Sequence, residues 1–293
     1  MYELIQAGAR TYYIECPSRM GLFLLPEGKV CLIDGGNDKD AGKKALKQIE
    51  ANGWELAMVL NTHSHADHVG GNALLHQRTG CAVYAPGVEA ALTRYPQLEA
   101  AGLYGGMPPK PLQGKALKAQ PSPALELTEE VLPEGLTCLR LDGHAAAMAA
   151  FHTADDVWFL GDSVASQATL EKYHVSFLHD PAAYLASLDA VEGLTGKLFV
   201  PAHVEPVEDI RPVVECNRAK LWEVVDVILA CCGAGNTQEE ILKGVFDHYG
   251  LTLDFAQYAL VGATVRSYLS WLLDTGRVSA AVSENRLLWQ AIS

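Results

Sequence analysis

Four side chains that can bind a metal ion lie within six positions of the stretch NTHSHADHVGG, which follows the apolar run AMVL. His63 and His65 are two residues apart, so at the end of an extended strand both point to the same side and can hold one ion. Asp67 and His68 then fall on a turn that enters a helix, where they can face a second ion. Imidazole and carboxylate groups are ligands of borderline divalent metals. The stretch therefore predicts a metal site at a strand-to-helix junction.

Further histidine and aspartate motifs accompany this stretch along the chain. CLIDGG contains Asp34, LDGH ends at His144, FLGDS contains Asp162 and VPAH ends at His203. In this order, and together with the HxHxDH pattern of the first stretch, they resemble the motifs of the metallo-β-lactamase-fold superfamily, in particular its glyoxalase II and lactonase hydrolases. The resemblance runs from the N-terminus to just beyond His203.

The resemblance implies a pair of metal ions, one held by three histidines and the other by an aspartate and two histidines, with Asp162 bridging them. Two neighbouring cations lower the pKa of a shared water and give a hydroxide nucleophile at neutral pH. Asp67 could also orient that hydroxide and relay a proton, whereas Asp34 is expected to support the ligands from behind. Zinc is the expected metal, and iron or manganese suits the same donors. The implied ligands are His63, His65 and His144 for one ion and Asp67, His68 and His203 for the other.

The sequence departs from well-known branches of the superfamily close to the predicted pocket. Glyoxalase II and lactonase enzymes usually continue the glycine-histidine motif with Thr-Pro-Gly, whereas this chain has three alanines and Met148, which predicts a smaller and more apolar pocket floor. The bridging aspartate argues against a class B β-lactamase, and His65 in place of a glutamate argues against a flavodiiron oxidoreductase. The candidate substrate contacts are His174, His179, Tyr104 and Met107.

We expect a dinuclear metal-dependent hydrolase that acts on a small thioester, lactone or ester. A metal-dependent phosphodiesterase or nuclease is the first alternative, because the same hydroxide can attack phosphorus, although a β-CASP-type nucleic-acid domain is not recognisable. The second alternative is a metal-sensing DNA-binding regulator whose output is the C-terminal region. Between Asn217 and Ser293, however, eight acidic residues outnumber six basic ones, and the candidate recognition helix carries only Arg266. This balance disfavours a nucleic-acid partner.

The elements around the motifs predict an α/β fold with a helical C-terminal region. Strand-like runs open the chain as a meander, and strands then alternate with helices. The segment from Tyr95 to Glu129, rich in Pro, Gly, Leu and Ala, is predicted to be a loop or lid. The resemblance implies a four-layer αββα sandwich over residues 1–212, followed by a small helical, winged-helix-like domain over residues 213–293. We expect this second domain to be structural or to form a homodimer.

The composition indicates the kind of partner and the cell compartment to expect. The 293 residues carry a net charge of -13, which disfavours polyanionic partners and favours a small-molecule substrate. Seven scattered cysteines without a CxxC pair indicate reduced thiols. No apolar run approaches the roughly 18 residues of a membrane span, and the N-terminus lacks the basic flank and apolar core of a signal peptide. We therefore expect a cytoplasmic protein without membrane contact.

Overall fold

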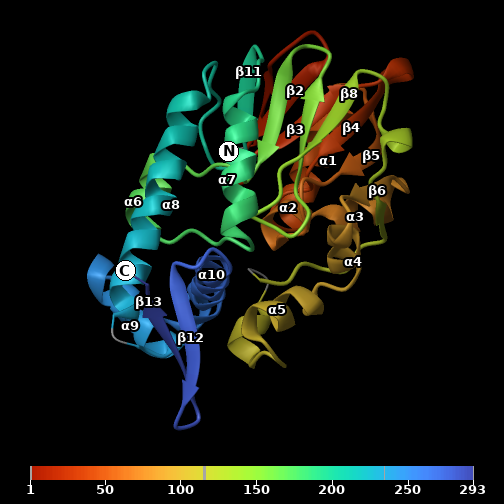
Figure 1. Ribbon diagram of the computed structural model, residues 1–293. Helices are drawn as coiled ribbons and strands as arrows, with labels where there is room; N and C mark the ends of the chain where they lie inside the picture. Colours follow the sequence, from red (N-terminus) through yellow and green to blue (C-terminus); the bar gives the residue numbers. More distant parts are fainter. Residues whose placement is uncertain (1, 115–116, 234, 293) are drawn as a thin grey trace.

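The computed structural model describes residues 2–114, 117–233 and 235–292. Two β-sheets pack face to face, and helices cover the outer face of each (Figure 1). Within the described residues, one sheet has seven strands in chain order and the other has four, in the order β11-β10-β9-β8. The predicted α/β architecture with two sheets and C-terminal helices is confirmed.

The first sheet begins as the predicted antiparallel meander and continues as a parallel sheet from β4 onward. Its central strands are apolar on both sides, because one face meets helices and the other meets the second sheet. The strands are β1 (Glu3–Gln6), β2 (Thr11–Glu15), β3 (Met20–Leu24), β4 (Lys29–Ile33), β5 (Glu55–Leu60), β6 (Ala82–Ala85) and β7 (Ala124–Glu126).

The second sheet is antiparallel from β8 to β10, and β11 pairs with β10 in parallel. Between the two sheets lies an apolar layer that includes the fully or almost fully buried rings of Phe23, Phe151 and Phe159. This layer fixes the relative position of the strand ends that carry the predicted ligands. The strands are β8 (Leu136–Arg140), β9 (Ala149–Thr153), β10 (Val157–Gly161) and β11 (Leu198–Pro201).

Helices α1 (Lys39–Ala51) and α3 (Asn72–Thr79) cover the first sheet. The Asp38 side chain accepts hydrogen bonds from the backbone N–H groups of residues 40 and 41, which caps α1. Apolar residues spaced by three or four positions on α1, such as Leu46 and Ile49, then face the strands. The short helix α2 (Ala66–Val69) follows β5 directly.

The C-terminal helices share one hydrophobic core with the second sheet. Leu160 of β10 and Leu188 of α7 lie in the same buried cluster as Ile228 of α8 and Leu269 of α10. The predicted boundary at residue 212 falls at the start of α8, and the division into two domains stays a prediction. The helices are α6 (Gln167–Tyr173), α7 (Pro181–Glu192), α8 (Arg211–Cys232), α9 (Gln238–Tyr249) and α10 (Phe255–Asp274).

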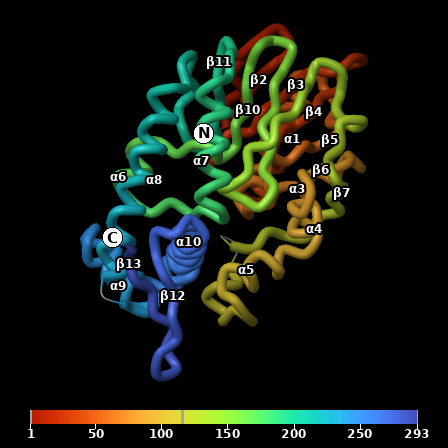
Figure 2. The backbone as a smooth tube through the Cα atoms, viewed as in Figure 1, coloured from red at the N-terminus to blue at the C-terminus, as the bar shows by residue number. Residues whose placement is uncertain are grey.

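A two-stranded hairpin, β12 (Val278–Ser283) and β13 (Arg286–Ala291), follows α10 and projects from the molecule (Figure 2). Thr237 and Glu240 form a capping box at the start of α9. The winged-helix assignment and the predicted homodimer stay predictions. Among the described residues, no helix has the length and apolar character needed to cross a bilayer.

The prediction that the segment from Tyr95 to Glu129 is a loop or lid is wrong for part of its length. It contains α5 (Gln97–Tyr104) and strand β7, and α4 (Val88–Arg94) immediately precedes it. Pro96 starts α5 and Gly105, with φ of 77°, ends it, so the Pro and Gly residues mark helix boundaries here. Helix α5 packs against α10 of the C-terminal region (Figure 1). Residues 115 and 116 lie outside the described part.

Candidate metal centre

The predicted ligands all follow the ends of strands. His63 and His65 come after β5, and α2 places Asp67 and His68 one turn further on. The remaining candidates follow strands of the second sheet, namely β8, β10 and β11. Because β5 belongs to the first sheet, the two sheets must be packed together before these side chains can meet. The structure brings all seven predicted ligands together in two groups that share Asp162.

Three imidazoles converge in the first group. Nε2 of His63 lies 2.8 Å from Nδ1 of His65, which lies 3.0 Å from Nε2 of His144. Burial holds the pKa of His63 well below its usual value and lowers the pKa of His65 and of His144 to about 4. Each neutral imidazole has one ring nitrogen with a free lone pair, which can bind a cation. Nδ1 of His65 faces two other ring nitrogens and can form a hydrogen bond with only one of them. Oδ2 of Asp162 completes the group at 3.4 Å from Nε2 of His144.

The second group combines carboxylates with two histidines. Oδ2 of Asp67 lies 3.1 Å from Nε2 of His203, and Oδ1 of Asp162 lies 3.2 Å from Nε2 of His68. Burial opposes charge on Asp162, but the imidazoles of His68 and His203 outweigh it, so the pKa of this carboxyl is held well below its usual range. The carboxylate is therefore ionised and offers one oxygen to each group.

The donor set fits a pair of divalent cations. Nε2 of His68 and Oδ1 of Asp162 are buried and have no hydrogen-bond partner of good geometry among the described residues. Buried polar atoms of this kind are costly unless something satisfies them, and a cation beside both would do so. Nitrogen and oxygen donors suit zinc, iron and manganese alike, so the donor set does not identify which of these metals binds.

The ring nitrogens that face away from the two ligand groups have polar partners of their own. Nδ1 of His68 lies 2.8 Å from Oδ2 of Asp34, a buried residue with φ of 63°, and Nδ1 of His63 lies 3.0 Å from the Thr62 hydroxyl. Nδ1 of His203 lies 2.9 Å from the backbone oxygen of Pro17. Such partners fix which ring nitrogen faces the metal. Asp34 thus occupies the supporting position expected of it.

Several residues that contact the predicted ligands were not predicted from the sequence. Thr62 precedes the first histidine of the motif, so its position alone could have suggested a role. Ser18, whose hydroxyl donates to Oδ2 of Asp67 at 2.9 Å, and Pro17 lie in the turn between β2 and β3, where no sequence signal links them to the metal ligands.

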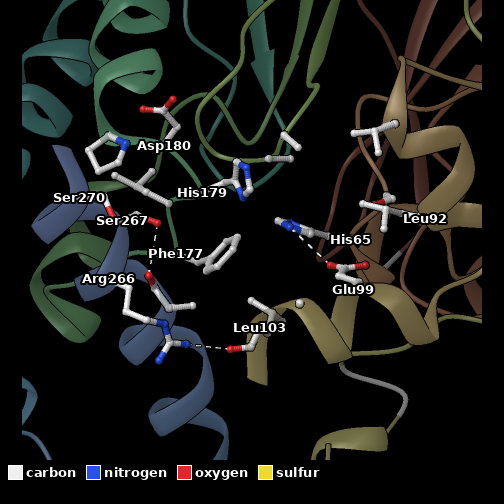
Figure 3. Close-up of a pocket in the computed structure, with 18 of the residues that line it drawn as sticks. His65, Leu92, Glu99, Leu103, Phe177, His179, Asp180, Arg266, Ser267 and Ser270 are labelled. Atoms are coloured by element: carbon white, nitrogen blue, oxygen red, sulfur yellow. Dashed lines mark hydrogen bonds and ion pairs between the residues drawn. The ribbon is translucent and has the colours of Figure 1, made fainter. Parts of the chain in front are cut away.

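Two chambers flank the metal ligands. The first, of about 720 Å³, is lined by His65 together with parts of α5 and α10. The second, of about 600 Å³, is lined by His144, Asp162 and His203 together with α6 and another part of α10. Phe177 lines both chambers, and Figure 3 shows its ring between His65 and the side chains of α10. A substrate that reaches the metal ligands can therefore extend to either side of Phe177.

Of the four predicted substrate contacts, one lines a chamber and three do not. His179 lines the first chamber, where it faces the same space as His65 (Figure 3). His174 lines neither chamber, because its ring stacks on Tyr249 with the ring centres 4.3 Å apart. Tyr104 and Met107 also line neither chamber, because they lie at and beyond the end of α5; the Met107 side chain is 83% exposed.

Glu99, Phe177 and Arg266 line the chambers but were not predicted as substrate contacts. Glu99 and Arg266 lie on α5 and α10, and Arg266 donates from Nη2 to the backbone oxygen of Leu103 at 3.1 Å (Figure 3). This contact turns the guanidinium of the candidate recognition helix toward α5. If the sequence of α5 had been predicted to be helical, Glu99 and Leu103, four residues apart, would have been expected on the same face of the helix.

Comparisons with known proteins agree with this arrangement. A family model described as the Metallo-beta-lactamase superfamily matches residues 15–203, which include all seven predicted ligands. A hydroxyacylglutathione hydrolase from Bradyrhizobium sp. (strain ORS 278) is 58% identical over 41 residues, or 14% of this chain and 16% of that protein. The matched part thus spans only about a sixth of that relative's length.

Solved structures resemble the whole chain in fold. A beta-lactamase domain protein from Burkholderia ambifaria has a TM-score of 0.74 at 18% identity, with 99% of this chain and 94% of that chain covered. A metallo-beta-lactamase family protein from Thermus thermophilus has a TM-score of 0.73 at 19% identity, with 100% and 98% covered. At this coverage the C-terminal helices are part of the shared fold. The chain belongs to the metallo-beta-lactamase superfamily.

Proposed function

We propose that this chain is a dinuclear metal-dependent hydrolase that acts on a small thioester, lactone or ester. The observation that carries the proposal is the sharing of Asp162 by two His/Asp groups beside two chambers. The family membership and the local similarity to a hydroxyacylglutathione hydrolase support the same reaction class.

Two divalent ions, when bound, would lower the pKa of a water molecule and polarise the substrate carbonyl. Hydrolysis joins the water oxygen to the carbonyl carbon and breaks the bond from that carbon to the oxygen or sulfur of the leaving group, which departs with a proton. The chain's own residues position these partners. Six side chains besides Asp162 would hold the ions: His63, His65 and His144 in one group, and Asp67, His68 and His203 in the other.

Asp67 is the candidate for orienting water. Burial raises its pKa, but His68 and His203 outweigh burial and hold the pKa well below the usual range, so the carboxylate stays ionised. Its side chain is 42% exposed, so it can accept a hydrogen bond from a water molecule. The Ser18 hydroxyl, which donates to Oδ2, limits the orientations that this carboxylate can take.

A covalent mechanism through cysteine is disfavoured. Cys16 is the cysteine that lines the second chamber, but burial raises the pKa of its thiol to about 11. Its sulfur lies 3.0 Å from the backbone oxygen of Ser18, as expected of a thiol that donates. A thiol that stays protonated at neutral pH is a poor nucleophile. Water is therefore the attacking group in this proposal.

The test is an activity screen of purified protein loaded separately with zinc, iron and manganese. The panel contains acyl-thioesters, lactones, phosphodiesters and β-lactams, so that the phosphodiesterase alternative is measured beside the proposal. We expect hydrolysis of thioesters or lactones that is lost in His65→Ala and Asp162→Ala. His248→Ala, which removes an exposed histidine of α9, is the matched control and should retain activity. Turnover that survives Asp162→Ala would contradict the proposal.

A further inference from the structure

A buried glutamate, Glu89, joins two loops that carry predicted metal ligands. It lies in the first turn of α4 and is 1% exposed. Oε2 accepts hydrogen bonds from the backbone N–H of Ser64 at 3.0 Å and from the Ser64 hydroxyl at 2.5 Å. Oε1 accepts one from the backbone N–H of Ala147 at 3.0 Å. Each oxygen of the carboxyl group is thus bound to a different loop.

Both of these loops belong to the first ligand group. Ser64 separates the two histidines that follow β5, and Ala147 is the third residue after His144. The first loop extends a strand of the seven-stranded sheet, whereas the second lies between β8 and β9 of the other sheet. Helix α4 belongs to neither sheet. Glu89 therefore connects, from outside both sheets, the two loops whose histidines must meet at one ion.

A backbone contact also joins the two loops, nearer to the strands. The N–H of Ala149, at the start of β9, donates to the backbone oxygen of Thr62 at 2.8 Å. Ser64 lies two residues beyond Thr62, and Ala147 lies two residues before Ala149. The two loops are therefore held together at two points, one at the strand ends and the other, through Glu89, next to the histidines.

The second ligand group has different supports. Its side chains are in contact with Asp34, Ser18 and the backbone oxygen of Pro17. Among the described residues, no side-chain hydrogen bond of Glu89 reaches these supports or the ligands of the second group. A change at Glu89 should therefore affect the first group selectively.

A carboxyl group suits this link because it places two oxygen acceptors on one short planar unit. The amide of a glutamine has the same size, but one of its two polar atoms is a nitrogen that donates. In Glu89→Gln, the donors of one loop would face that nitrogen. Buried donors without an acceptor are costly, so this loop would have to move.

We propose that Glu89 is a positioning residue, which holds the three histidines of the first group at the spacing that one cation requires. This inference rests on the metal centre of the proposed function. The link to Ala147 lies where this chain has three alanines in place of the Thr-Pro-Gly that glyoxalase II and lactonase enzymes usually have after the histidine. Metal binding here thus depends on a residue of α4 that contacts no ligand side chain through a hydrogen bond of its own.

The first experiment measures hydrogen exchange of single backbone amides by NMR in metal-free protein. In Glu89→Gln, we expect the amide of Ser64 or that of Ala147 to exchange at least about tenfold faster, because one of them loses its acceptor. Thr93→Val is the matched control on the same helix. Thr93 is equally buried and its hydroxyl has no hydrogen-bond partner among the described residues, so both amides should keep their exchange rates.

The second experiment measures zinc affinity at each group by competitive titration with a chelator, together with the visible absorption of cobalt-loaded protein. His144→Ala and His203→Ala, which each remove a ligand of one group, assign the two binding steps. We expect Glu89→Gln to lower affinity at the first group by at least about tenfold and at the second by less than about threefold. Ser64→Ala keeps the backbone donor to Oε2 and should lose less, and Thr93→Val should lose nothing.

The outcomes separate this inference from the proposed function. Zinc binding at both groups without hydrolysis of any substrate would refute the proposed function and leave the inference standing. Unchanged exchange at both amides, first-group affinity within about threefold of the wild type, or an equal loss at both groups would overturn the inference. If Glu89→Gln does not fold, Glu89→Asp takes its place with the same expected results, because a side chain shorter by one methylene cannot reach both loops.

Discussion

Oε1 of Glu99 lies 3.5 Å from Nε2 of His65, on the side of the imidazole opposite the Nδ1 atom that meets His63 and His144. Burial raises the pKa of Glu99 to about 8, but Oε1 can accept a hydrogen bond from Nε2–H whether or not the carboxyl is protonated at its other oxygen. An acceptor in this position favours the tautomer that leaves Nδ1 free for a cation. Glu99 belongs to α5, and Arg266 of α10 holds the end of α5 through the backbone oxygen of Leu103. The C-terminal region is thereby linked to a predicted metal ligand.

Replacing Glu99 should weaken the first metal group selectively. We expect Glu99→Gln to lower zinc affinity at that group by about 10- to 100-fold, because outer partners of ligating histidines have effects of this size. Affinity at the second group should be unchanged. Competitive titration with a chelator, together with the visible absorption of the cobalt-loaded protein, measures both groups. Glu126→Gln, at an exposed position of β7, is the control, and an equal loss at both groups would refute the assignment.

Asp34 should be important for stability even without metal. Its carboxylate accepts hydrogen bonds from the N–H and hydroxyl of Thr62, both at 2.8 Å, and lies beside Nδ1 of His68. Asp34→Ala leaves these buried groups without a partner, so we expect a loss of about 3 kcal/mol in the free energy of unfolding. Urea denaturation of metal-free protein measures it. Asp34→Asn tolerates the positive φ and keeps one acceptor oxygen for the N–H of Thr62, so it should lose less. An equal loss in the two variants would contradict this account.

Gly71 should tolerate no side chain. A Cβ atom there would lie 2.2 Å from the backbone oxygen of Gly35 and 2.9 Å from Cα of Gly42, so the backbone behind the ligand loop would have to move. We expect Gly71→Ala to cost more than about 3 kcal/mol of folding free energy and to reduce metal binding. In Gly102→Ala on α5, a Cβ meets no atom within 4 Å, and stability should stay equal or rise.

The effect of Asp155 on stability should depend on pH. Burial raises its pKa, but hydrogen bonds from the N–H of Arg10, at 2.7 Å, and from the Thr11 hydroxyl, at 2.8 Å, outweigh burial and hold the pKa below the usual value. Because the folded state binds fewer protons at this group, its contribution is complete above the unfolded pKa of about 3.9 and fades as pH falls.

Asp155→Asn should therefore be less stable than the wild type at pH 7, and the difference should shrink below about pH 4. Denaturant titrations at several pH values give the comparison. Asp156→Asn is the neighbouring control, because Asp156 is exposed and its carboxylate lies 3.0 Å from His152, outside the contacts with Arg10 and Thr11. A constant difference across the pH range would exclude the proposed linkage.

The C-terminal helices should be required for folding of the second sheet. Leu160 and Leu188 share a buried cluster with Ile228 and Leu269, so a chain that ends at residue 212 would expose an apolar face. We expect the full chain to unfold in one calorimetric transition and the truncated chain to be insoluble. A chain that ends at Arg277 lacks only the largely exposed hairpin and should keep the fold. Two separate transitions in the full chain would show that the regions fold independently.

The ligand cluster could be predicted because its residues are local to strand ends and follow recognisable motifs. His63, His65, Asp67 and His68 lie within six positions, and each remaining ligand belongs to a short motif after a strand. The surroundings could not be predicted in this way. Glu99 faces His65 only because α5 packs against α10, a contact between residues more than 150 positions apart that no local pattern encodes.

The segment that carries α5 shows a second limit. Its Pro and Gly residues suggested irregular structure, but Pro96 and Gly105 mark the two ends of the helix. The helix keeps its fold through tertiary packing, which outweighs its weak local pattern. Tyr104 and Met107, the candidate substrate contacts from the same segment, line neither chamber.

A single helix, α10, lines both chambers on which Phe177 borders, whereas the predicted ligands lie on loops that follow strands. Substitutions along α10 can alter which compounds enter without disturbing the strand ends that carry the histidines and aspartates. Laboratory evolution aimed at new substrates should therefore accumulate its beneficial changes in this one helix, far along the chain from the NTHSHADHVGG loop.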